Sequence, residues 1–233
     1  MKNQVSCIIP AYNEGDRILN VLNAVKNHSL IKEILVINNN SKDNTKQVVN
    51  SFIKSNKLKN LKLFDANEHQ GKAYAMYYGI NKAKGNTILF LDADLQNLNP
   101  ENITNLVQPI INNEVDMTLG HRGDVHFFFK PFKFDPWGGE RAIKKQLFLE
   151  MPNYSHSKYG IESLINNFLI KAKKRIQVIP ILNVTNTRKG KKSNYLGGIY
   201  EDYKMIKQIF LIMQFKTFIR DTFYIQKMQK LPY

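Results

Sequence analysis

The sequence is short of cysteine, acidic side chains and long apolar runs, and each shortage excludes a class of protein. A single cysteine, Cys7, stands among 233 residues, so no disulfide framework can form within the chain and secretion gains no support. No apolar run approaches the roughly 18–20 residues that span a bilayer, and the brief apolar stretch near Met1 is unlike a signal peptide. We therefore expect a soluble, cytoplasmic protein.

Acidic residues are outnumbered, since 19 Asp and Glu stand against 34 Lys and Arg, for a formal net charge of +15. Such an excess favours anionic partners, which include nucleic acid, phosphorylated ligands and an acidic membrane face. A basic composition that only keeps the chain soluble would have the same net charge, so charge alone leaves both interpretations open. The other fractions, 43% apolar and 23% charged residues, are those of a folded domain and exclude disorder, collagen and a coiled coil for the chain as a whole.

Short apolar runs alternate with stretches of helical periodicity in the first half of the chain. The runs predict strands over 5–10, 33–37, 61–64 and 87–91, and the periodic stretches predict helices around 18–25, 48–53 and 71–83. This alternation predicts an α/β fold with a mostly parallel, Rossmann-like sheet flanked by helices on both faces. Ligands bind beyond the carboxyl ends of such strands, where polar clusters occur at 12–14, 38–40 and 92–94.

The second half of the chain is less regular. Asn99 and Pro100 are typical of a helix start, and a strand over 115–119 follows that helix. We expect further helices over 139–149 and 160–172, a strand over 176–184 that Pro180 interrupts, and a final helix from Tyr203 onward. Aromatic residues are frequent over 127–137, and a basic loop covers 188–192.

Two aspartates one residue apart, Asp92 and Asp94, directly follow the predicted strand over 87–91. Alternate side chains of an extended stretch point to the same side, so both carboxylates face one way. Paired carboxylates, with water and phosphate oxygens, suit Mg²⁺ or Mn²⁺, and such a cation would neutralise a diphosphate leaving group. A solvated turn with two acids is the alternative, because Asp-x-Asp is a common pattern.

Several sequence blocks stand in a fixed order around this pair. Four blocks resemble segments of family 2 glycosyltransferases, which have the GT-A fold. The opening segment of the family is similar to residues 8–14, and its Asp-Asp-Gly-Ser-x-Asp-x-Thr segment is similar to residues 38–45. The stretch before the metal motif is similar to residues 71–85, and the metal motif itself to residues 91–95. Residues 120–122 and 135–142 resemble the later Gly-Ser-Arg and Asp-x-x-Ser-Gly-x-Arg-Ala blocks of the dolichyl-phosphate mannosyltransferase and glucosyl-phosphoglycerate synthase branches. The resemblance is closest over 4–95 and fades beyond about residue 200.

For the donor, the resemblance implies a nucleotide pocket at the ends of the first strands. Pro10, Tyr12 and Glu14 would line this pocket, with Glu14 near the ribose, and Lys72 would approach the diphosphate. Asn39 stands where the family has a base-reading aspartate. An amide can still accept a hydrogen bond from a base, but it adds a donor and loses a charge, which leaves the base open.

For the metal and the chemistry, the resemblance implies Asp94 as a direct metal ligand and Asp92 near the ribose or metal-bound water. Related enzymes add a histidine after the last strand, whereas this sequence has Asn186 in that region. Glu162 is the candidate general base, with an ordinary surface glutamate on a helix as the alternative.

Four basic residues are candidates for binding a phosphate of the acceptor or donor: His121, Arg122, Arg141 and Arg188. Arginine offers a planar fork of donors that matches phosphate oxygens. For Arg141 the alternative is a salt-bridged residue on an amphipathic helix. For Arg188 the functional interpretation is a lid that closes over a diphosphate, and the alternative is a solvated loop.

The resulting hypothesis is a metal-dependent glycosyltransferase that uses a UDP- or GDP-linked sugar. A single domain over 1–233 would comprise a nucleotide-binding half over 1–95, an acceptor half over 96–200 and a C-terminal amphipathic helix over 201–233. The net charge and the basic C-terminal helix favour a polyprenyl or other lipid phosphate as acceptor, used through peripheral contact at the inner membrane face. A small phosphorylated acid such as phosphoglycerate is the alternative acceptor, and the helix could instead pack on the domain or form a homodimer.

Two hypotheses from other classes remain. A nucleotidyltransferase would need a Gly-rich phosphate loop near the N-terminus, which residues 9–15 do not provide. A basic nucleic-acid-binding module is supported by the charge alone, because no helix-turn-helix, zinc or RNA-binding pattern occurs, and we expect no nucleic-acid partner.

Overall fold

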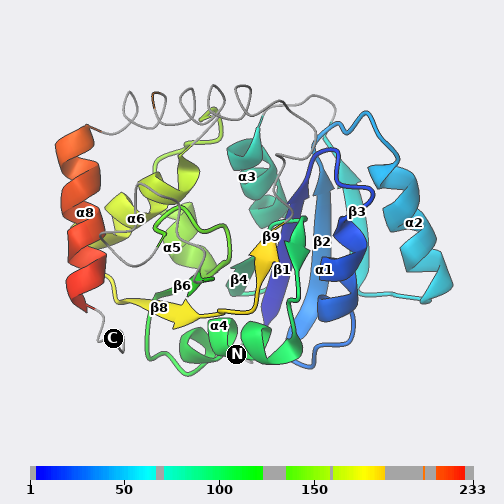
Figure 1. Ribbon diagram of the computed structural model, residues 1–233, viewed down its shortest axis with the longest axis horizontal. Coiled ribbons are helices and arrows are strands. Elements are labelled where there is room, and N and C mark those ends of the chain that lie inside the picture. The colour runs from blue at the N-terminus through cyan, green and yellow to red at the C-terminus, as the bar shows by residue number, and fades with distance from the viewer. Residues whose placement is uncertain are drawn as a thin grey trace.

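The computed structural model of the chain describes residues 4–66, 71–122, 135–157, 160–186, 207 and 214–228. Its strands are β1 (Val5–Ala11), β2 (Ile31–Asn38), β3 (Leu61–Asp65), β4 (Thr87–Phe90), β5 (Leu95–Gln96), β6 (Met117–His121), β7 (Arg141–Lys144), β8 (Ile176–Pro180) and β9 (Thr185–Asn186). Seven of them form one sheet in the order β3-β2-β1-β4-β7-β6-β8, and β5 pairs with β9 in a small second sheet (Figure 1).

The large sheet is parallel except for β7, which runs antiparallel to its two neighbours, β4 and β6. The predicted mostly parallel sheet is therefore confirmed. Because parallel strands all end at the same edge, the loops after β1, β2, β4 and β6 gather there, at the edge where ligands bind in sheets of this kind.

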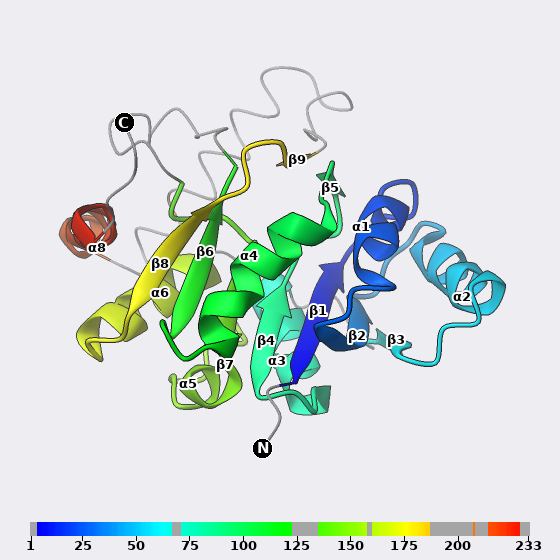
Figure 2. The ribbon, with the colours of Figure 1, turned by 90° about the horizontal axis from the view of Figure 1, so that it is seen from below.

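Helices cover both faces of the sheet, as predicted. On one face pack α1 (Ile18–Val25), α2 (Thr45–Ser55) and α4 (Pro100–Ile111); on the other pack α3 (Lys72–Lys82), α5 (Lys145–Leu149), α6 (Ile161–Lys171) and α8 (Phe215–Met228) (Figure 2). Side chains alternate along a strand, so Ile8 of β1 joins the α3 side while Cys7 and Ile9 join the α1 side. Both faces are buried, which explains why the central strands are apolar throughout.

A local sequence signal explains where α4 begins. The Asn99 side chain accepts a hydrogen bond from the Asn102 backbone N–H, and the Asn102 side chain accepts from that of Asn99, so the predicted start of α4 is confirmed as a reciprocal cap before Pro100. The predicted helix over 160–172 is likewise present as α6.

The predicted helix over 139–149 is wrong for its first part. Residues Arg141–Lys144 form β7, and only Lys145–Leu149 are helical. Ile143 pairs with Ile88 of β4 on one side and with Met117 of β6 on the other. These partners are distant in sequence, so burial between two strands overrides the local helical periodicity.

The C-terminal helix is described over Phe215–Met228, where its apolar face packs on α6 and β8 with Phe218 and Ile225 buried. The aromatic stretch over 127–134, the basic loop over 188–192 and most of 201–213 lie outside the described residues. Among the helices that the structure does describe, none is long and apolar enough to cross a bilayer.

Candidate functional site

The loop after β2 holds the loop after β1 through its side chains. Ser41 Oγ accepts a hydrogen bond from the Asn13 backbone N–H (3.0 Å), and Thr45 Oγ1 accepts one from the Glu14 backbone N–H (2.9 Å). Asp43 Oδ1 in turn accepts from the Thr45 backbone N–H (3.0 Å). The serine, aspartate and threonine of the 38–45 block therefore fix the loop that carries Glu14.

Asn39 connects the end of β2 to the start of α3. Its side chain, 3% exposed, donates through Nδ2 to the carbonyl oxygen of Gly71 (3.0 Å). Gly71 has a φ of 89°, a region that favours glycine, and Lys72 follows as the first residue of α3. An ionised aspartate at position 39 would have no proton to donate here, so the asparagine suits this connection.

Lys72 brings two distant carboxylates together. Its Nζ lies 2.6 Å from Asp92 Oδ1 and 2.8 Å from Glu162 Oε1 (α6). Burial alone would lower the pKa of Lys72, but Asp92 and Glu162 outweigh it and raise that pKa. Burial alone would raise the pKa of Asp92, but Lys72 and then Arg122 hold it below its usual range. Three residues singled out by the sequence thus meet at the carboxyl edge of the sheet.

Asp94 precedes the small two-stranded sheet. Leu95, the next residue, pairs with Asn186 of β9, so Asn186 lies beside the residue that follows Asp94. Carboxylate and amide oxygens are hard donors of the kind that Mg²⁺ and Mn²⁺ accept. Among the described residues no cluster of three or more His, Cys, Asp or Glu forms a candidate metal site, so a cation held here would also need water or substrate oxygens.

Glu140 is a buried acid that the sequence patterns do not single out. Its Oε1 accepts from Arg122 Nη1 (3.3 Å), and its Oε2 has no hydrogen-bond partner within the described parts of the chain. Burial raises the pKa of Glu140 to about 7, against the opposing effect of Arg122. The sequence signal that it offers is its place between Gly139 and Arg141 in the 135–142 block.

His121 ends β6 and Arg122 follows it, at the same edge of the sheet. Burial, and then Arg122, lower the pKa of His121. Burial alone would lower the pKa of Arg122, but Glu140 and Asp92 raise it. The structure therefore brings Arg122 close to Glu140 and Asp92, the second of which pairs with Lys72.

The structure places Arg141 in the core instead of at a phosphate site. Its side chain is 0% exposed, and its guanidinium donates to the carbonyl oxygens of Gly138 (2.5 Å) and Glu162 (3.4 Å) and to Asn166 Oδ1 (3.3 Å). The predicted phosphate contact is not supported, because these donors hold the turn over 135–140 against α6. Arg141 also lies on a strand, not on the amphipathic helix that the sequence suggested.

The same turn is held by further residues that sequence reasoning missed. Trp137 Nε1 donates to Ser163 Oγ (3.0 Å), and Asn166 Nδ2 donates to the Pro136 carbonyl (3.1 Å). A Cβ on Gly139 would lie 2.4 Å from both carboxylate oxygens of Asp92, so only glycine lets the turn approach the acid so closely. Contacts between positions so far apart leave no local pattern in the sequence.

Among the described residues, eight charged side chains interact at this edge or in the core directly beneath it: Lys72, Arg122, Arg141, Asp92, Asp94, Asp135, Glu140 and Glu162. Five of these groups are carboxylates and three are cations, so acids outnumber bases among the described side chains here. Carboxylate oxygens are donors that a divalent cation accepts.

The remaining predicted residues lie around this cluster or outside it. Pro10 pairs with Ile37 near the end of β1, and Tyr12 is 40% exposed just beyond. Glu14 is buried, with Oε2 2.6 Å from Arg17 Nε. Arg188 lies outside the described residues.

Comparison with protein families matches residues 6–181 of this chain to the model described as glycosyl transferase family 2. The glycosyltransferase AglE of Haloferax volcanii is 32% identical over 169 residues, covering 71% of this chain and 52% of that protein. The dolichyl-phosphate beta-glucosyltransferase of Dictyostelium discoideum is 32% identical over 99 residues, covering 39% of this chain and 30% of that protein. The chain thus spans about half, or less, of the length of these curated relatives.

A solved structure shows the same fold. Glucosyl-3-phosphoglycerate synthase from Mycobacterium tuberculosis, crystallised with Mn²⁺, UDP and glucosyl-3-phosphoglycerate, superposes with a TM-score of 0.68 at 17% identity, covering 89% of this chain and 79% of that one. The same synthase is also known with UDP-glucose and phosphoglyceric acid. At this identity the likeness shows the fold, a GT-A type sheet flanked by helices.

Proposed function

Because the chain belongs to glycosyl transferase family 2, we propose that it moves a sugar from a nucleotide-diphosphate sugar to an anionic acceptor. The observation that carries the proposal is the meeting of Lys72, Asp92 and Glu162 beside Asp94, at the sheet edge where α/β folds bind ligands. Family membership favours this activity over a nucleotidyltransferase or a nucleic-acid-binding module.

The donor would bind over the ends of β1, β2 and β4. The nucleoside would lie by Pro10, Tyr12, Glu14 and Asn39, and the diphosphate would lie by Lys72. Asp94 and Asn186 would hold Mg²⁺ or Mn²⁺, which when bound neutralises charge on the departing diphosphate. Support comes from the excess of carboxylates over cations among the described side chains at this edge, and from the Mn²⁺ and UDP present in the structural neighbour.

The acceptor would be a phosphate, with a polyprenyl or other lipid phosphate favoured. Its oxygen would form the new bond to the sugar as the bond to the diphosphate breaks. A phosphate is already ionised at neutral pH, so this reaction needs no strong base, and Glu162 would serve by holding Lys72 in place. Arg122 would face the acceptor phosphate, because arginine binds phosphate oxygens in a planar fork.

Two observations bear on which phosphate is used. The dolichyl-phosphate glucosyltransferase among the relatives and the net charge of +15 favour a lipid phosphate at the cytoplasmic face of a membrane. The structural neighbour that binds phosphoglyceric acid keeps a small phosphorylated acid as the alternative acceptor. Transfer assays with polyprenyl phosphate and with phosphoglycerate, read by mass spectrometry, would separate the two.

Calorimetry with UDP or GDP, with and without Mn²⁺, tests the donor site directly. Asp94→Ala should lose the metal-dependent part of nucleotide affinity, at least tenfold, and abolish sugar transfer, because it removes a carboxylate ligand. Glu114→Ala is the matched control, since this exposed acid precedes β6 at the opposite end of the sheet. Metal-dependent affinity that is unchanged in Asp94→Ala would refute the proposed role of the aspartate.

A further inference from the structure

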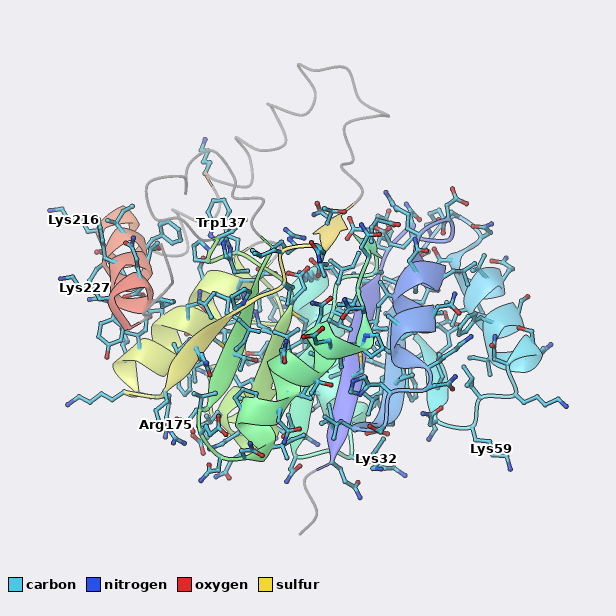
Figure 3. The ribbon with its side chains drawn as sticks, turned by 60° about the horizontal axis from the view of Figure 1, so that its bottom comes forward. Lys32, Lys59, Trp137, Arg175, Lys216 and Lys227 are labelled. Carbon is cyan, nitrogen blue, oxygen red and sulfur yellow. The ribbon has the colours of Figure 1, made fainter. Side chains whose placement is uncertain are left out.

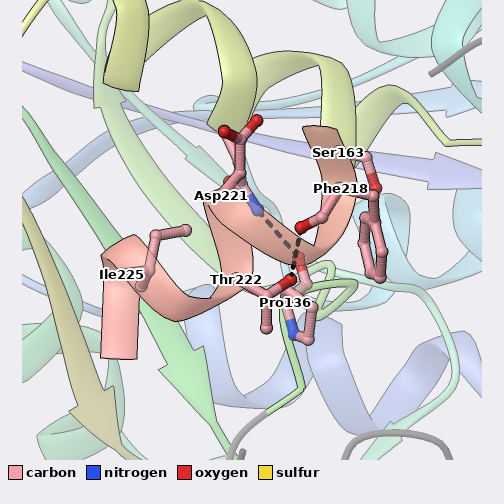
Figure 4. Close-up of a pocket in the computed structure, with 7 residues that line it drawn as sticks. Pro136, Ser163, Phe218, Asp221, Thr222 and Ile225 are labelled. Carbon is pink, nitrogen blue, oxygen red and sulfur yellow. Dashed lines mark hydrogen bonds between the residues drawn. The ribbon is translucent and has the colours of Figure 1, made fainter. Parts of the chain in front are cut away.

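The C-terminal helix α8 has a buried face and an exposed face of different chemistry. Its inner side helps to line a small cavity against α6, formed by Pro136, Ser163, Asn166, Phe218, Asp221, Thr222 and Ile225 (Figure 4). Asp221, the single acid of α8, points inward and accepts from Asn167 Nδ2 of α6 (2.6 Å). The other carboxylate oxygen of Asp221 accepts from Arg220 Nη2 (2.8 Å), so this acid is shared between α6 and the neighbouring arginine.

The outer face of α8 carries basic and aromatic side chains. Lys216, Arg220, Phe223 and Lys227 recur at helical spacing along one stripe, with Tyr224 beside it, and all five are exposed. Phe223 and Tyr224 are 49% and 40% exposed, two of the six large apolar side chains that are exposed in the described chain. Lys216 and Lys227 point away from the body of the protein (Figure 3).

We propose that this stripe, formed by Lys216, Arg220, Phe223, Tyr224 and Lys227, docks on the surface of an anionic lipid bilayer. Lysine and arginine are attracted to anionic headgroups, and aromatic rings favour the boundary between headgroups and acyl chains. A helix with both on one face lies in the plane of the interface. Electrostatic attraction alone would explain the basic residues, but it would not explain two neighbouring aromatic rings exposed to water.

The docked helix would lie next to the candidate site. On its inner face the Phe218 ring packs on Trp137, with ring centroids 5.7 Å apart. Trp137 belongs to the turn over 135–140, whose Gly139 contacts Asp92. A lipid phosphate held at the bilayer surface would thus be presented near the reacting groups, a consequence that rests on the proposed function.

Co-sedimentation with vesicles of phosphatidylglycerol and phosphatidylcholine, against vesicles of phosphatidylcholine alone, tests the docking. Lys216→Glu/Lys227→Glu should weaken binding to the anionic vesicles by at least tenfold at low salt. Lys32→Glu/Lys59→Glu is the matched control, because it makes the same change in net charge at exposed positions remote from α8 (Figure 3). The control should weaken binding by no more than about twofold, because it leaves the stripe intact.

A second variant tests the aromatic part of the stripe. Phe223→Ser/Tyr224→Ser keeps every charge, so it should still bind anionic vesicles at low salt. At moderate salt, where electrostatic attraction is screened, it should lose the vesicle binding that the native protein retains. Trp137, the one tryptophan of the chain, should change its fluorescence when the native protein binds anionic vesicles.

Three outcomes would overturn the proposal: no binding to anionic vesicles at low salt, an equal loss in the Lys32/Lys59 control, or binding of RNA with the same dependence on Lys216 and Lys227. Calorimetry with UDP and Mn²⁺ on the same variants separates this proposal from the proposed function. Vesicle binding without nucleotide binding would refute the proposed glycosyltransferase function but not the proposed docking of α8. Nucleotide binding without vesicle binding would refute the docking alone.

Discussion

At the scale of single residues, the site is a set of buried charges that balance one another only in part. Lys72 forms short ion pairs with both Asp92 and Glu162, so one positive charge is shared by two carboxylates. Arg122 neutralises Glu140 incompletely, because one Glu140 oxygen lacks a partner among the described groups. Ionisation of Glu140 therefore costs the folded protein free energy, because a buried charge is only partly compensated.

Replacing Glu140 by Gln should change how stability depends on pH. The raised pKa of Glu140, about 7, means that the folded chain holds a proton that the unfolded chain has already lost above its ordinary pKa. The free energy of unfolding should therefore fall as pH rises from about 4.5 to 7, with a slope of at most about 1.4 kcal/mol per pH unit. Denaturant titrations of metal-free protein across this range should show a flatter profile in Glu140→Gln. Parallel profiles, or the same flattening in the exposed control Glu114→Gln, would contradict the assigned pKa.

At the scale of elements, the strand β7 decides how the two halves of the sheet are joined. It inserts between β4 and β6. The Nζ atom of its last residue, Lys144, lies 2.6 Å from Asp116 Oδ1. Arg175, just before β8, also bonds Asp116 through its side chain and its backbone N–H. One carboxylate thus links β6, β7 and β8 at the end of the sheet opposite the site.

Asp116→Asn should destabilise the protein by about 2 kcal/mol at pH 7, because it removes the charge that Lys144 and Arg175 share. Burial alone would raise the pKa of Asp116, but Arg175 and Lys144 hold it far below its usual range. The stabilisation is therefore full above about pH 4 and is lost as pH falls further, so wild type and variant should converge in acid. Urea denaturation at pH 7 and pH 3 measures both effects. A constant difference between the two at both pH values would show that the link does not depend on the carboxylate charge.

The same strand shows where prediction from the sequence reaches its limit. The strands β1 to β4 follow apolar runs bounded by polar turns, and α4 has a cap in its own sequence, so local patterns suffice to predict them. β7 has only four residues, and its pairing with β4 and β6 is not a local property. The residues of the candidate site likewise fall into those that local sequence patterns predict and those that they do not. Lys72, Asp92 and Asp94 stand in recognisable blocks, whereas Glu140 and Asn166 take part through contacts that only the fold creates.

At the scale of the whole molecule, the two halves of the chain meet at one sheet edge. The first half supplies Lys72 and Asp92, and the second half supplies Arg122, Glu140 and Glu162. The turn over 135–140 joins them, held by Arg141 and α6 from within and by Phe218 of α8 on its other side. The integrity of the site therefore depends on α8, although α8 lies far along the chain from the aspartate pair.

Phe218→Ala tests this dependence in the whole protein. The Phe218 side chain is 4% exposed, so its removal leaves a cavity beside Trp137 and should lower the free energy of unfolding by about 3 kcal/mol. Trp137 should also become more exposed to water, which shifts its emission to longer wavelength. Phe223→Ala is the matched control on the same helix, because Phe223 is 49% exposed and its loss should change stability by no more than about 0.5 kcal/mol. If the two variants unfolded alike and left the Trp137 emission unchanged, α8 would not be docked against the turn in solution, and its outer stripe would have no fixed position beside the site.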